Sequence, residues 1–466
     1  MSELPSGWNY FSLNDLGGLS GGKTPSKANP AFWSSPDVPW VSPKDMKRNL
    51  LEDAEDRISQ VAVAEASMAL YPAGSVLMVT RSGILQHTFP VALAGAELTV
   101  NQDIKVLRPV EGIAPKFAFY LLKSHGGAIL SACSKDGTTV QSIDSEKLEA
   151  FQFPLPPFSE QTRITKKLDE LLAQVDTLKA RIDGIPALLK RFRQSVLAAA
   201  VSGRLTEEWR VSLMSSEATN GLPSPEQAAV SATWFSFIHD EIADVIDPHP
   251  SHRTPSEDPN GIPYIGIGDI NKLGLIDFEN ARKVSRSVLD EHRDRYSIND
   301  GDFIFGKIGT IGSATKVPAG GEYTISANVI LVKPIREKVV PSYHFLFWCS
   351  PLALEISSKG SKATSQAAFG IKKMRKAELL YPPMAEQTEI VRRVEQLFAF
   401  ADQLEAKIAS AKSRIDHLTQ SILTKAFRGE LVPQDPNDEP ASLLLERIKA
   451  QRAAAPKAKR GRKASA

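Results

Sequence analysis

Two stretches of this chain carry apolar residues at alternating spacings of four and three, with polar and charged residues between them. This spacing keeps one apolar seam along a helix and is typical of a coiled coil. The first seam predicts a helix that begins near Ser159, directly after Pro156 and Pro157. Gly184 and Pro186 interrupt this stretch, so we expect either one kinked helix or two stacked helices. The seam positions are Ile164, Leu168, Leu171, Val175, Leu178 and Ile182 in the first stretch, and Ile390, Val394, Leu397, Leu404, Ile408, Ile415 and Leu418 in the second.

The second stretch contains no glycine or proline inside its seam, which predicts one continuous helix of about 43 residues, or about 65 Å. Two seams of similar length in one chain are natural partners for each other. If a two-fold axis perpendicular to the helices relates them, the helices run antiparallel. The alternative is that each seam packs only on its neighbouring module, since surface helices also carry apolar stripes.

The two helical stretches are copies of one another. Between residues 156 and 205, 18 of 50 positions are identical to the residues 226 positions later. The sequence Pro-Pro-x-x-Glu-Gln opens both copies, with Glu160 in the first and Glu386 in the second. A repeat of this length predicts a duplicated scaffold. The copies differ at Gly184 and Pro186, which correspond to Ser410 and Lys412, so the two helices are predicted to differ in shape.

The regions outside the helices contain short β-like runs cut by glycine and proline, which predicts two mixed α/β modules. We therefore predict an α+β fold, with two modules separated by two long antiparallel coiled-coil helices in pseudo-two-fold symmetry. The predicted segments are a first module at 1–157, a central helical region at 158–205, a second module at 206–383, a C-terminal helical region at 384–432, and a basic, disordered tail at 433–466.

Composition narrows the class of protein. A chain of 466 residues that is 42% hydrophobic and 24% charged can form several ordinary cores. It has no apolar run of the roughly 18 residues that a membrane span needs, and its first residues do not resemble a signal peptide. Two distant cysteines, Cys133 and Cys349, predict a reduced, cytoplasmic protein. The net charge of +2 favours no partner by itself.

One segment formally matches a nucleotide-binding loop. Residues Gly17 to Thr24 satisfy G-x-x-x-x-G-K-[ST], the sequence that holds phosphates where a strand passes into a helix. The preceding residues do not form a hydrophobic strand, however, and Pro25 follows where the helix would begin. We expect a flexible, cation-bearing loop that approaches a phosphate backbone.

Other catalytic patterns are incomplete. Leu155-Pro-Pro-Phe158 resembles the motif of amino-methyltransferases, but Leu155 cannot accept a hydrogen bond from a base amine, and Tyr381 fails in the same way. Asp37 with Asp45 and Lys47 only imitates a nuclease pattern, and the His and Cys residues have no zinc spacing. We predict no catalytic residue, cofactor site or metal ligand on this chain.

The loops of both modules carry cations among Ser, Thr, Gly and Trp residues, the residue types that contact phosphates and base edges. Each such residue taken singly is more often a solvated surface charge. The predicted DNA-binding residues are Lys23, Thr24, Lys27, Lys44, Arg81 and Ser82 in the first module, and Arg253, Thr254, Lys307 and Lys316 in the second.

The succession of module, Pro-Pro-x-x-Glu-Gln helix, module and Pro-Pro-x-x-Glu-Gln helix resembles the specificity subunit of type I restriction-modification systems. Stretches such as 167–176, 189–197, 390–398 and 418–431 are similar to conserved regions of the enterobacterial type IA branch. The resemblance covers the whole architecture and is weak in the two modules, which correspond to the family's variable target-recognition domains.

The resemblance implies that each module reads one half of a bipartite, asymmetric target in double-stranded DNA, while the helices set the spacer. A helix over 160–182 spans roughly 35 Å, close to one turn of B-DNA. The resemblance also implies two methyltransferase subunits, which bring S-adenosylmethionine and flip an adenine in each half-site. It implies two restriction subunits as well, which use ATP and Mg. The chain itself would be non-catalytic and would bind no cofactor. A coiled-coil scaffold that joins protein partners is the alternative.

Overall fold

The computed structural model describes residues 4–135, 140–217, 234–249, 253–271, 274–307, 314–359 and 369–454. The chain divides into two compact units. Unit 1 comprises Met1–Arg181 and Ser410–Ala466, and unit 2 comprises Ile182–Ala409. Each unit therefore contains one module together with a part of each long helix. None of the helices in these described stretches is long and apolar enough to cross a membrane.

Unit 1 contains strands from both ends of the first module. Its strands are β1 (Asn9–Ser12), β2 (Gly17–Gly21), β3 (Val38–Val41), β4 (Leu50–Leu51), β5 (Arg57–Ile58), β6 (Val76–Val79), β7 (Val91–Ala94), β8 (Thr99–Val100), β9 (Ile104–Pro109), β10 (Ser134–Lys135), β11 (Ser142–Ile143) and β12 (Gln152–Leu155). Its helices, beside the long ones, are α1 (Leu13–Leu16), η1 (Pro30–Phe32), α2 (Gln60–Glu65), η2 (Gly83–Gln86), α3 (Pro115–Ser124), α4 (Gly126–Cys133), α5 (Ser145–Ala150) and α14 (Ala441–Ala454).

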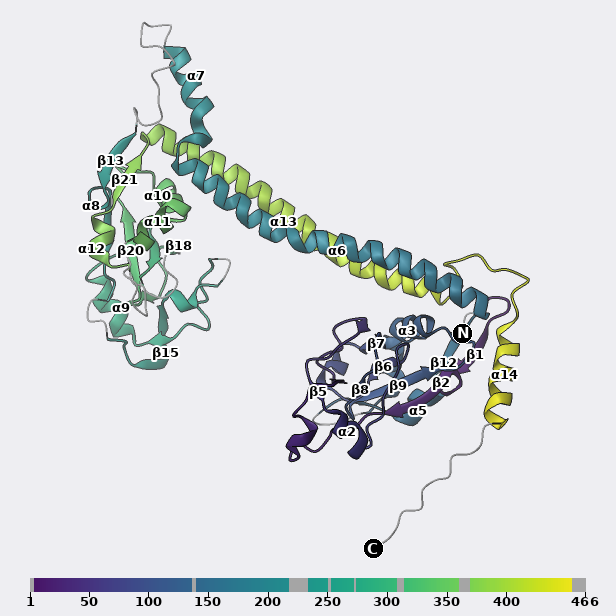
Figure 1. The fold of residues 1–466 in the computed structure, drawn as a ribbon. Coiled ribbons are helices and arrows are strands. Elements are labelled where there is room, and N and C mark those ends of the chain that lie inside the picture. Colours follow the sequence, from purple (N-terminus) through teal and green to yellow (C-terminus); the bar gives the residue numbers. More distant parts are fainter. Residues whose placement is uncertain are drawn as a thin grey trace. The chain divides into compact units, whose positions relative to one another are not determined.

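These strands form a five-stranded sheet in the order β2-β9-β6-β7-β4, a three-stranded sheet β5-β3-β8, and the two-stranded pairs β1-β12 and β10-β11. Runs such as Val76–Val79 are buried at every position, which explains why they are continuously apolar rather than alternating. Helix α3 packs on β7, β6 and β9 of the larger sheet, and its Phe117 and Leu121 are buried in the core of unit 1. Figure 1 shows this module and the long helices that border it.

Unit 2 has elements of its own throughout the second module. Its strands are β13 (Phe235–Ile238), β14 (Ala243–Ile246), β15 (Glu257–Ile265), β16 (Lys283–Val284), β17 (Phe303–Gly306), β18 (Ala314–Lys316), β19 (Thr324–Ile325), β20 (Val329–Pro334) and β21 (Glu378–Tyr381). Its shorter helices are η3 (Arg204–Thr206), α7 (Glu207–Glu217), α8 (His239–Ile242), η7 (Ile267–Asp269), α9 (Arg286–Arg293), α10 (Pro341–Trp348), α11 (Pro351–Lys359) and α12 (Ile371–Arg375).

The second module repeats the topology of the first although their sequences differ. Its sheets have the orders β14-β20-β17-β18, β16-β15-β19 and β13-β21, which match β2-β9-β6-β7, β5-β3-β8 and β1-β12 of unit 1. The register is repeated too, because Asn9 faces Leu155 in one pair and Phe235 faces Tyr381 in the other. Duplication therefore extends to the modules, where the sequence alone shows only scattered matches.

Two long helices, α6 (Phe158–Val201) and α13 (Met384–Ala426), confirm the prediction from the apolar seams. Helix α6 continues through Pro186, so the first helix is a single element. Within unit 1, Lys179 of α6 pairs with Asp416 of α13 at 2.9 Å. Within unit 2, Arg193 of α6 pairs with Glu405 at 2.7 Å. The helices run antiparallel, and Figure 1 shows them side by side within each unit.

The seams are also part of the module cores. Ile164 and Leu168 are completely buried in the core of unit 1, and Ile390 and Val394 are completely buried in the core of unit 2. Val175 is buried as well. The remaining seam residues are half-buried, apart from two leucines that are exposed by nearly half: Leu178 by 45% and Leu418 by 46%. Both packing arrangements considered for the seams therefore contribute, each over a different part of the helices.

The repeated Glu-Gln pair holds each long helix to its module. In unit 1, the Trp8 indole donates to Glu160 at 2.9 Å, and Gln161 donates to the carbonyl of Pro156 at 3.2 Å. In unit 2, the indole of Trp234 donates to Glu386 at 3.3 Å, and an equivalent glutamine bond is present at 2.9 Å. These residues recur in the sequence because each fixes a helix start, and so they have a structural role.

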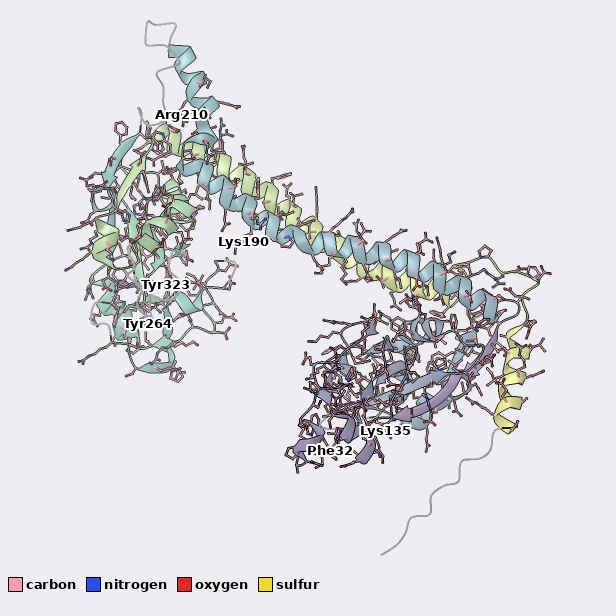
Figure 2. The ribbon with its side chains drawn as sticks, in the orientation of Figure 1. Phe32, Lys135, Lys190, Arg210, Tyr264 and Tyr323 are labelled. Carbon is pink, nitrogen blue, oxygen red and sulfur yellow. The ribbon has the colours of Figure 1, made fainter. Side chains whose placement is uncertain are left out.

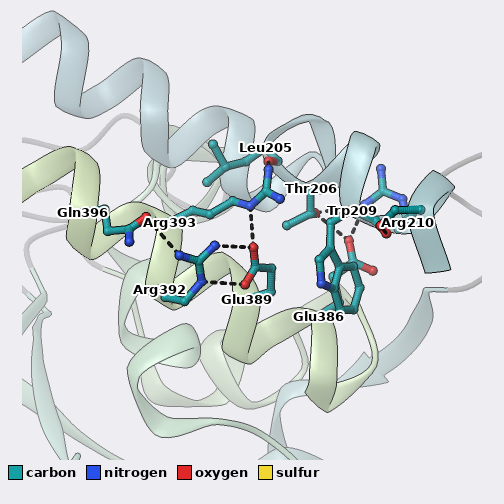
Figure 3. Close-up of polar contacts among 10 residues, drawn as sticks. Leu205, Thr206, Trp209, Arg210, Glu386, Glu389, Arg392, Arg393 and Gln396 are labelled. Carbon is teal, nitrogen blue, oxygen red and sulfur yellow. Dashed lines mark hydrogen bonds and ion pairs between the residues drawn. The ribbon is translucent and has the colours of Figure 1, made fainter.

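Glu386 has further partners that Glu160 lacks. Thr206 donates to Glu386 at 2.7 Å and Arg210 forms an ion pair with it, as Figure 3 shows. One turn further along α13, Arg392 and Arg393 both bind Glu389, which lowers the pKa of that carboxyl to about 2. This network joins η3 and α7, which follow α6, to the start of α13 within unit 2. The repeat counterparts of Thr206 and Arg210 in unit 1 are Val432 and Pro436, which cannot donate.

Two sequence-based expectations were wrong. The segment from residue 433 was predicted to be disordered, but Ala441–Ala454 forms helix α14, with Leu444 and Ile448 buried against the unit 1 core. Its apolar residues outweigh the high charge that suggested disorder, and residues 455–466 lie outside the described residues. The expected flexible loop at 17–24 was also misplaced, because Gly17–Gly21 is strand β2, hydrogen-bonded along β9.

Candidate DNA interface

In unit 1, several predicted DNA-binding residues meet at the turn between β8 and β9. The backbone amide of Lys23 donates to the last carbonyl of β8 at 3.1 Å, and the Thr24 hydroxyl donates to Gln102 in the turn. From the other side, Arg81 follows strand β6 and forms an ion pair with Asp103 at 2.6 Å. We define Lys23, Thr24, Arg81, Gln102 and Asp103 as the β8–β9 cluster.

Gly22 makes this arrangement possible. A Cβ atom at residue 22 would overlap the carbonyl groups of Val100 and Asn101, so only glycine lets the loop after β2 cross the turn this closely. A third segment reaches the turn from β3, because the amide of Asn101 donates to the carbonyl of Val41 at 2.9 Å. The turn is therefore fixed by backbone bonds on three sides.

The cations of unit 1 differ in how available they are. Lys23 and Lys27 are exposed and have no ion pair within the described ranges, so they can contact phosphates directly. The side chain of Arg81 remains 57% exposed although Asp103 holds it. Lys44 pairs with both Asp56 and Glu55, and these two carboxylates raise the pKa of its amine. Two acids thus cancel the charge of Lys44, which is a weaker candidate than its sequence context indicated.

Ser82 has a structural role in the same segment. Its side chain accepts the amide of Ile84 and caps the short helix η2. The P-loop match has no structural basis, because Lys23 follows a strand and the next helical residues begin only at Pro30.

Unit 2 has the equivalent turn between β19 and β20. The amide of Lys307, which follows β17, donates to the carbonyl of Asn328 at 3.1 Å, and the amide of Ser326 donates to Ile265 at 2.8 Å. These two bonds match two of unit 1, from the Arg81 amide to the Asp103 carbonyl at 3.3 Å and from the Asn101 amide to Val41. The amine of Lys307 lies 3.5 Å from Asp247 and is mostly buried, at 16% exposure. Its charge therefore serves first to position the loop that follows β14.

A chain of histidines fixes the loop that contains Arg253 and Thr254. The Arg253 carbonyl can only accept, so His249 donates to it through Nε2 at 2.7 Å, and His249 Nδ1 accepts from His292 at 2.8 Å. The remaining His292 nitrogen faces the Thr324 hydroxyl at the end of β19. Burial lowers the pKa of His292 to about 4, which keeps its imidazole uncharged at neutral pH.

Aromatic packing supports the relay. The Tyr264 ring stands edge-on to His249, with centroids 5.9 Å apart, and Figure 2 places Tyr264 and Tyr323 in the same part of unit 2. Arg253 and Thr254 are both exposed, so the relay presents them beside the β19–β20 turn.

Lys316 lies elsewhere. In the strand pairing it lies opposite Phe303 at the start of β17, whereas Lys307 follows the end of that strand. The amine of Lys316 lies 5.1 Å from the centroid of the Phe345 ring. The structure therefore groups Arg253, Thr254 and Lys307 near one turn and separates Lys316 from them.

The sequence interpretation missed the polar residues of the turns themselves. Asn101 and Gln102 in unit 1, and Ser326 and Asn328 in unit 2, carry no charge and lie between short strands, so no motif marks them. The side-chain amides of asparagine and glutamine are the type that pairs with adenine edges. Among the residues that the structure describes, no group of three or more His, Cys, Asp or Glu side chains could hold a metal ion.

Comparison with known proteins identifies the class to which these paired modules belong. A family model described as the type I restriction modification DNA specificity domain matches residues 5–187 and 234–411. The chain is 36% identical over 358 residues to the Escherichia coli type I restriction enzyme EcoBI specificity subunit, covering 75% of this chain and 74% of that one. It is 34% identical over 378 residues to the EcoKI specificity subunit of Escherichia coli strain K12, covering 77% and 76%.

The chain therefore belongs to the family of type I restriction-modification specificity subunits. A solved structure from work on complex assembly and conformational transition of the type I R-M system shares its fold. The two superpose with a TM-score of 0.59 at 18% identity, over 92% of this chain and 100% of that chain.

Proposed function

We propose that this chain is the DNA sequence-specificity subunit of a type I restriction-modification complex, with each module reading one half of a bipartite, asymmetric target. The observation that supports this most is the pair of matching turns, β8–β9 in unit 1 and β19–β20 in unit 2. The two turns share two backbone hydrogen bonds, yet they present different polar and cationic side chains. A common frame with different surfaces suits two modules that read different sequences.

Within each module, we assign different tasks to cations and amides. Exposed Lys23 and Lys27 contact phosphates and set the position of the module, since phosphate contacts carry no sequence information. Gln102, which is exposed, reads base edges, because an amide pairs with adenine through two hydrogen bonds. In unit 2, Arg253 beside the β19–β20 turn is the candidate for reading base edges.

The long helices set the length of the unspecified spacer and dock the partners. We infer two methyltransferase subunits, which bring S-adenosylmethionine, and two restriction subunits, which bring ATP hydrolysis and Mg. The chain itself is non-catalytic in this assignment. The segment boundaries predicted at residues 157, 205, 383 and 432 define the pieces that can be exchanged between relatives.

The first test uses the complex of this chain with its methyltransferase subunits, after methylation-sensitive sequencing of host DNA has identified the target. Exchange of residues 1–157 for those of another specificity subunit is expected to replace one half-site and keep the other. Replacement of both half-sites would contradict independent reading by the modules.

A second test separates base from phosphate contacts. Gln102→Ala is expected to cost about 1–3 kcal/mol of discrimination at one position of one half-site. Lys23→Ala should weaken binding to all sequences alike and lower the slope of log K against log salt by about 0.9. Equal effects of both variants on every sequence would refute the assignment of Gln102 to base reading.

A third test addresses the spacer. Insertion of four residues, about one helical turn, after Gly184 is expected to change the spacer length while both half-sites stay the same. An unchanged spacer would contradict the role of the helices in setting it.

A further inference from the structure

The two units differ in what covers the short sheet at the base of each module. In unit 1, helix α14 lies against β1 and α1, and its Leu444 and Ile448 are buried. Beside this helix is a hollow of about 500 Å³, here called the β1 hollow, which is lined by Gly112, Phe158 and Leu444. The first module thus has its base covered by the C-terminal part of the same chain.

Unit 2 has the corresponding hollow, also of about 500 Å³, on the equivalent face of β13. We call it the β13 hollow; its lining includes Phe235, Phe237, Glu241, Lys338 and Met384. Met384 and Lys338 are the repeat counterparts of Phe158 and Gly112, so the two hollows occupy the same place in the duplicated fold. Within the described part of unit 2, no helix occupies the place that α14 takes in unit 1.

The β13 hollow is more apolar than its partly covered counterpart. Phe235 replaces Asn9 and is 56% exposed, and Met384 is 41% exposed. The rings of Phe235 and Phe237 lie together, with centroids 6.4 Å apart. Neighbouring exposed aromatic and methionine side chains around a hollow mark a binding surface more often than scattered single ones do.

Charge at the edge of the hollow indicates the occupant. In unit 1, Arg452 near the end of α14 approaches Asp15, at 3.9 Å, and donates to the backbone carbonyl of Gly17 at 3.3 Å. The counterpart of Asp15 is Glu241, which lines the β13 hollow, and Glu337 also lines it. Both glutamates are exposed. An acidic edge beside an apolar floor is complementary to an apolar helix that ends in a cation.

We propose that the β13 hollow is a docking site for a partner protein's amphipathic helix of the α14 type, with an apolar stripe and an arginine near its C-terminal end. The residues of this chain that correspond to α14, 215–228, contain Gly221, Pro223 and Pro225 and lack the triple leucine of 443–445. A helix with such a stripe is therefore supplied from outside. This proposal is independent of DNA reading, so either can fail without the other.

One substitution between the hollows makes the proposal specific. A Cβ atom at Gly112 would collide with the Leu444 side chain, so the glycine makes room for that leucine. Lys338 occupies the same place in unit 2, with its amine donating to the carbonyl of Glu241 at 2.6 Å. The partner helix accordingly has a small residue where α14 has Leu444.

The test measures binding of two labelled peptides of residues 436–454, the natural one and one with Leu444→Ala, to the full chain. We expect the alanine peptide to bind the natural chain more tightly, and we expect Lys338→Gly to reverse that preference. Because Gly112 is the same in both chains, exchange of the peptide with α14 in unit 1 cannot produce the reversal. An identical preference in both chains, or no saturable binding, would overturn the proposal.

Matched surface variants locate the site. Phe235→Glu and Met384→Glu should each weaken binding of the alanine peptide at least tenfold, equivalent to about 1.4 kcal/mol. Leu380→Glu is the control, since Leu380 is 46% exposed on the opposite face of the same two-stranded sheet and should leave binding unchanged. If the free chain forms dimers and Phe235→Glu dissociates them, the occupant is a second copy of the chain and the proposal is overturned. If the peptides bind only after deletion of residues 218–233, the occupant is this chain's own segment, and the proposal is overturned as well.

Discussion

Replacing the two repeated glutamates by glutamine is expected to have opposite effects, although the residues are copies of one another. Glu386 is buried and has a cationic partner in Arg210, whose side chain is only 10% exposed. Glu160 is equally buried, but its Oε1 atom has no hydrogen-bond partner. Burial raises the pKa of its carboxyl, and the hydrogen bond from Trp8 opposes this shift by lowering the pKa. The same chemical change therefore removes an ion pair in unit 2 and an uncompensated charge in unit 1.

The magnitudes follow from these contacts. Glu386→Gln leaves Arg210 charged and buried, and breaking a buried pair on one side costs about 3 kcal/mol. For a unit of this size, that loss lowers Tm by about 6–12 °C. Glu160→Gln keeps an acceptor for the Trp8 indole and removes the desolvated charge, so we expect unit 1 to be unchanged or stabilised by up to about 1 kcal/mol at neutral pH.

The dependence on pH gives an independent check. Because the folded-state pKa of Glu160 lies above its usual value of 4.5, the folded state binds the proton more tightly than the unfolded state. The cost of the charge is therefore complete above the folded pKa and disappears as the pH falls to about 4.5 and below. Glu160→Gln should remove this contribution to the pH dependence of unit 1.

Hydrogen exchange measured by mass spectrometry reports on the two units separately, through peptides that contain residue 160 or residue 386. Urea denaturation followed by tryptophan fluorescence gives the corresponding free energies of unfolding. The reasoning fails if Glu160→Gln destabilises its unit as much as Glu386→Gln does, or if Glu386→Gln leaves unit 2 unaffected. Combining Arg210→Leu with Glu386→Gln should recover part of the loss, since no buried charge then remains.

Three further substitutions test other parts of the structure. Gly184→Ala should raise the free energy of unfolding in urea by about 0.5–1 kcal/mol, because a Cβ there meets nothing within 4 Å and glycine weakens a helix interior; a lower free energy of unfolding would mean that the glycine is needed for packing. Arg193→Ala should cost less than about 1 kcal/mol despite two ion pairs, because its partners are exposed, and high salt should erase the difference. For His292, burial lowers the folded pKa from 6.5 to about 4, so it contributes to a loss of stability of unit 2 as the pH falls from about 6.5 to about 4, and His292→Gln should reduce that loss in a pH series of melting curves.

The sequence by itself determined the scaffold of this protein. The alternating spacing of apolar residues gave both long helices, with α13 covering 43 residues as predicted, because helical periodicity is a local property that needs no knowledge of distant contacts. The repeat with an offset of 226 residues predicted the duplication, and the resemblance carried by Pro-Pro-x-x-Glu-Gln indicated the family. The role of that motif did not follow, because Glu160 binds Trp8 and Gln161 accepts the amide of Ala114 at 3.3 Å, both far away in the sequence.

Only the tertiary structure decided which polar residues meet. Lys23, Arg81 and Gln102 are distant in sequence and come together because three strands end at one turn, whereas Lys44 looks equally suitable in sequence and is cancelled by two acids. Helix α14 was missed for the same reason: its stability comes from leucines buried against another segment, and local charge does not reveal that burial. Local periodicity fixes helices in advance, while a binding surface depends on burial, pairing and strand order, which exist only once the chain has folded.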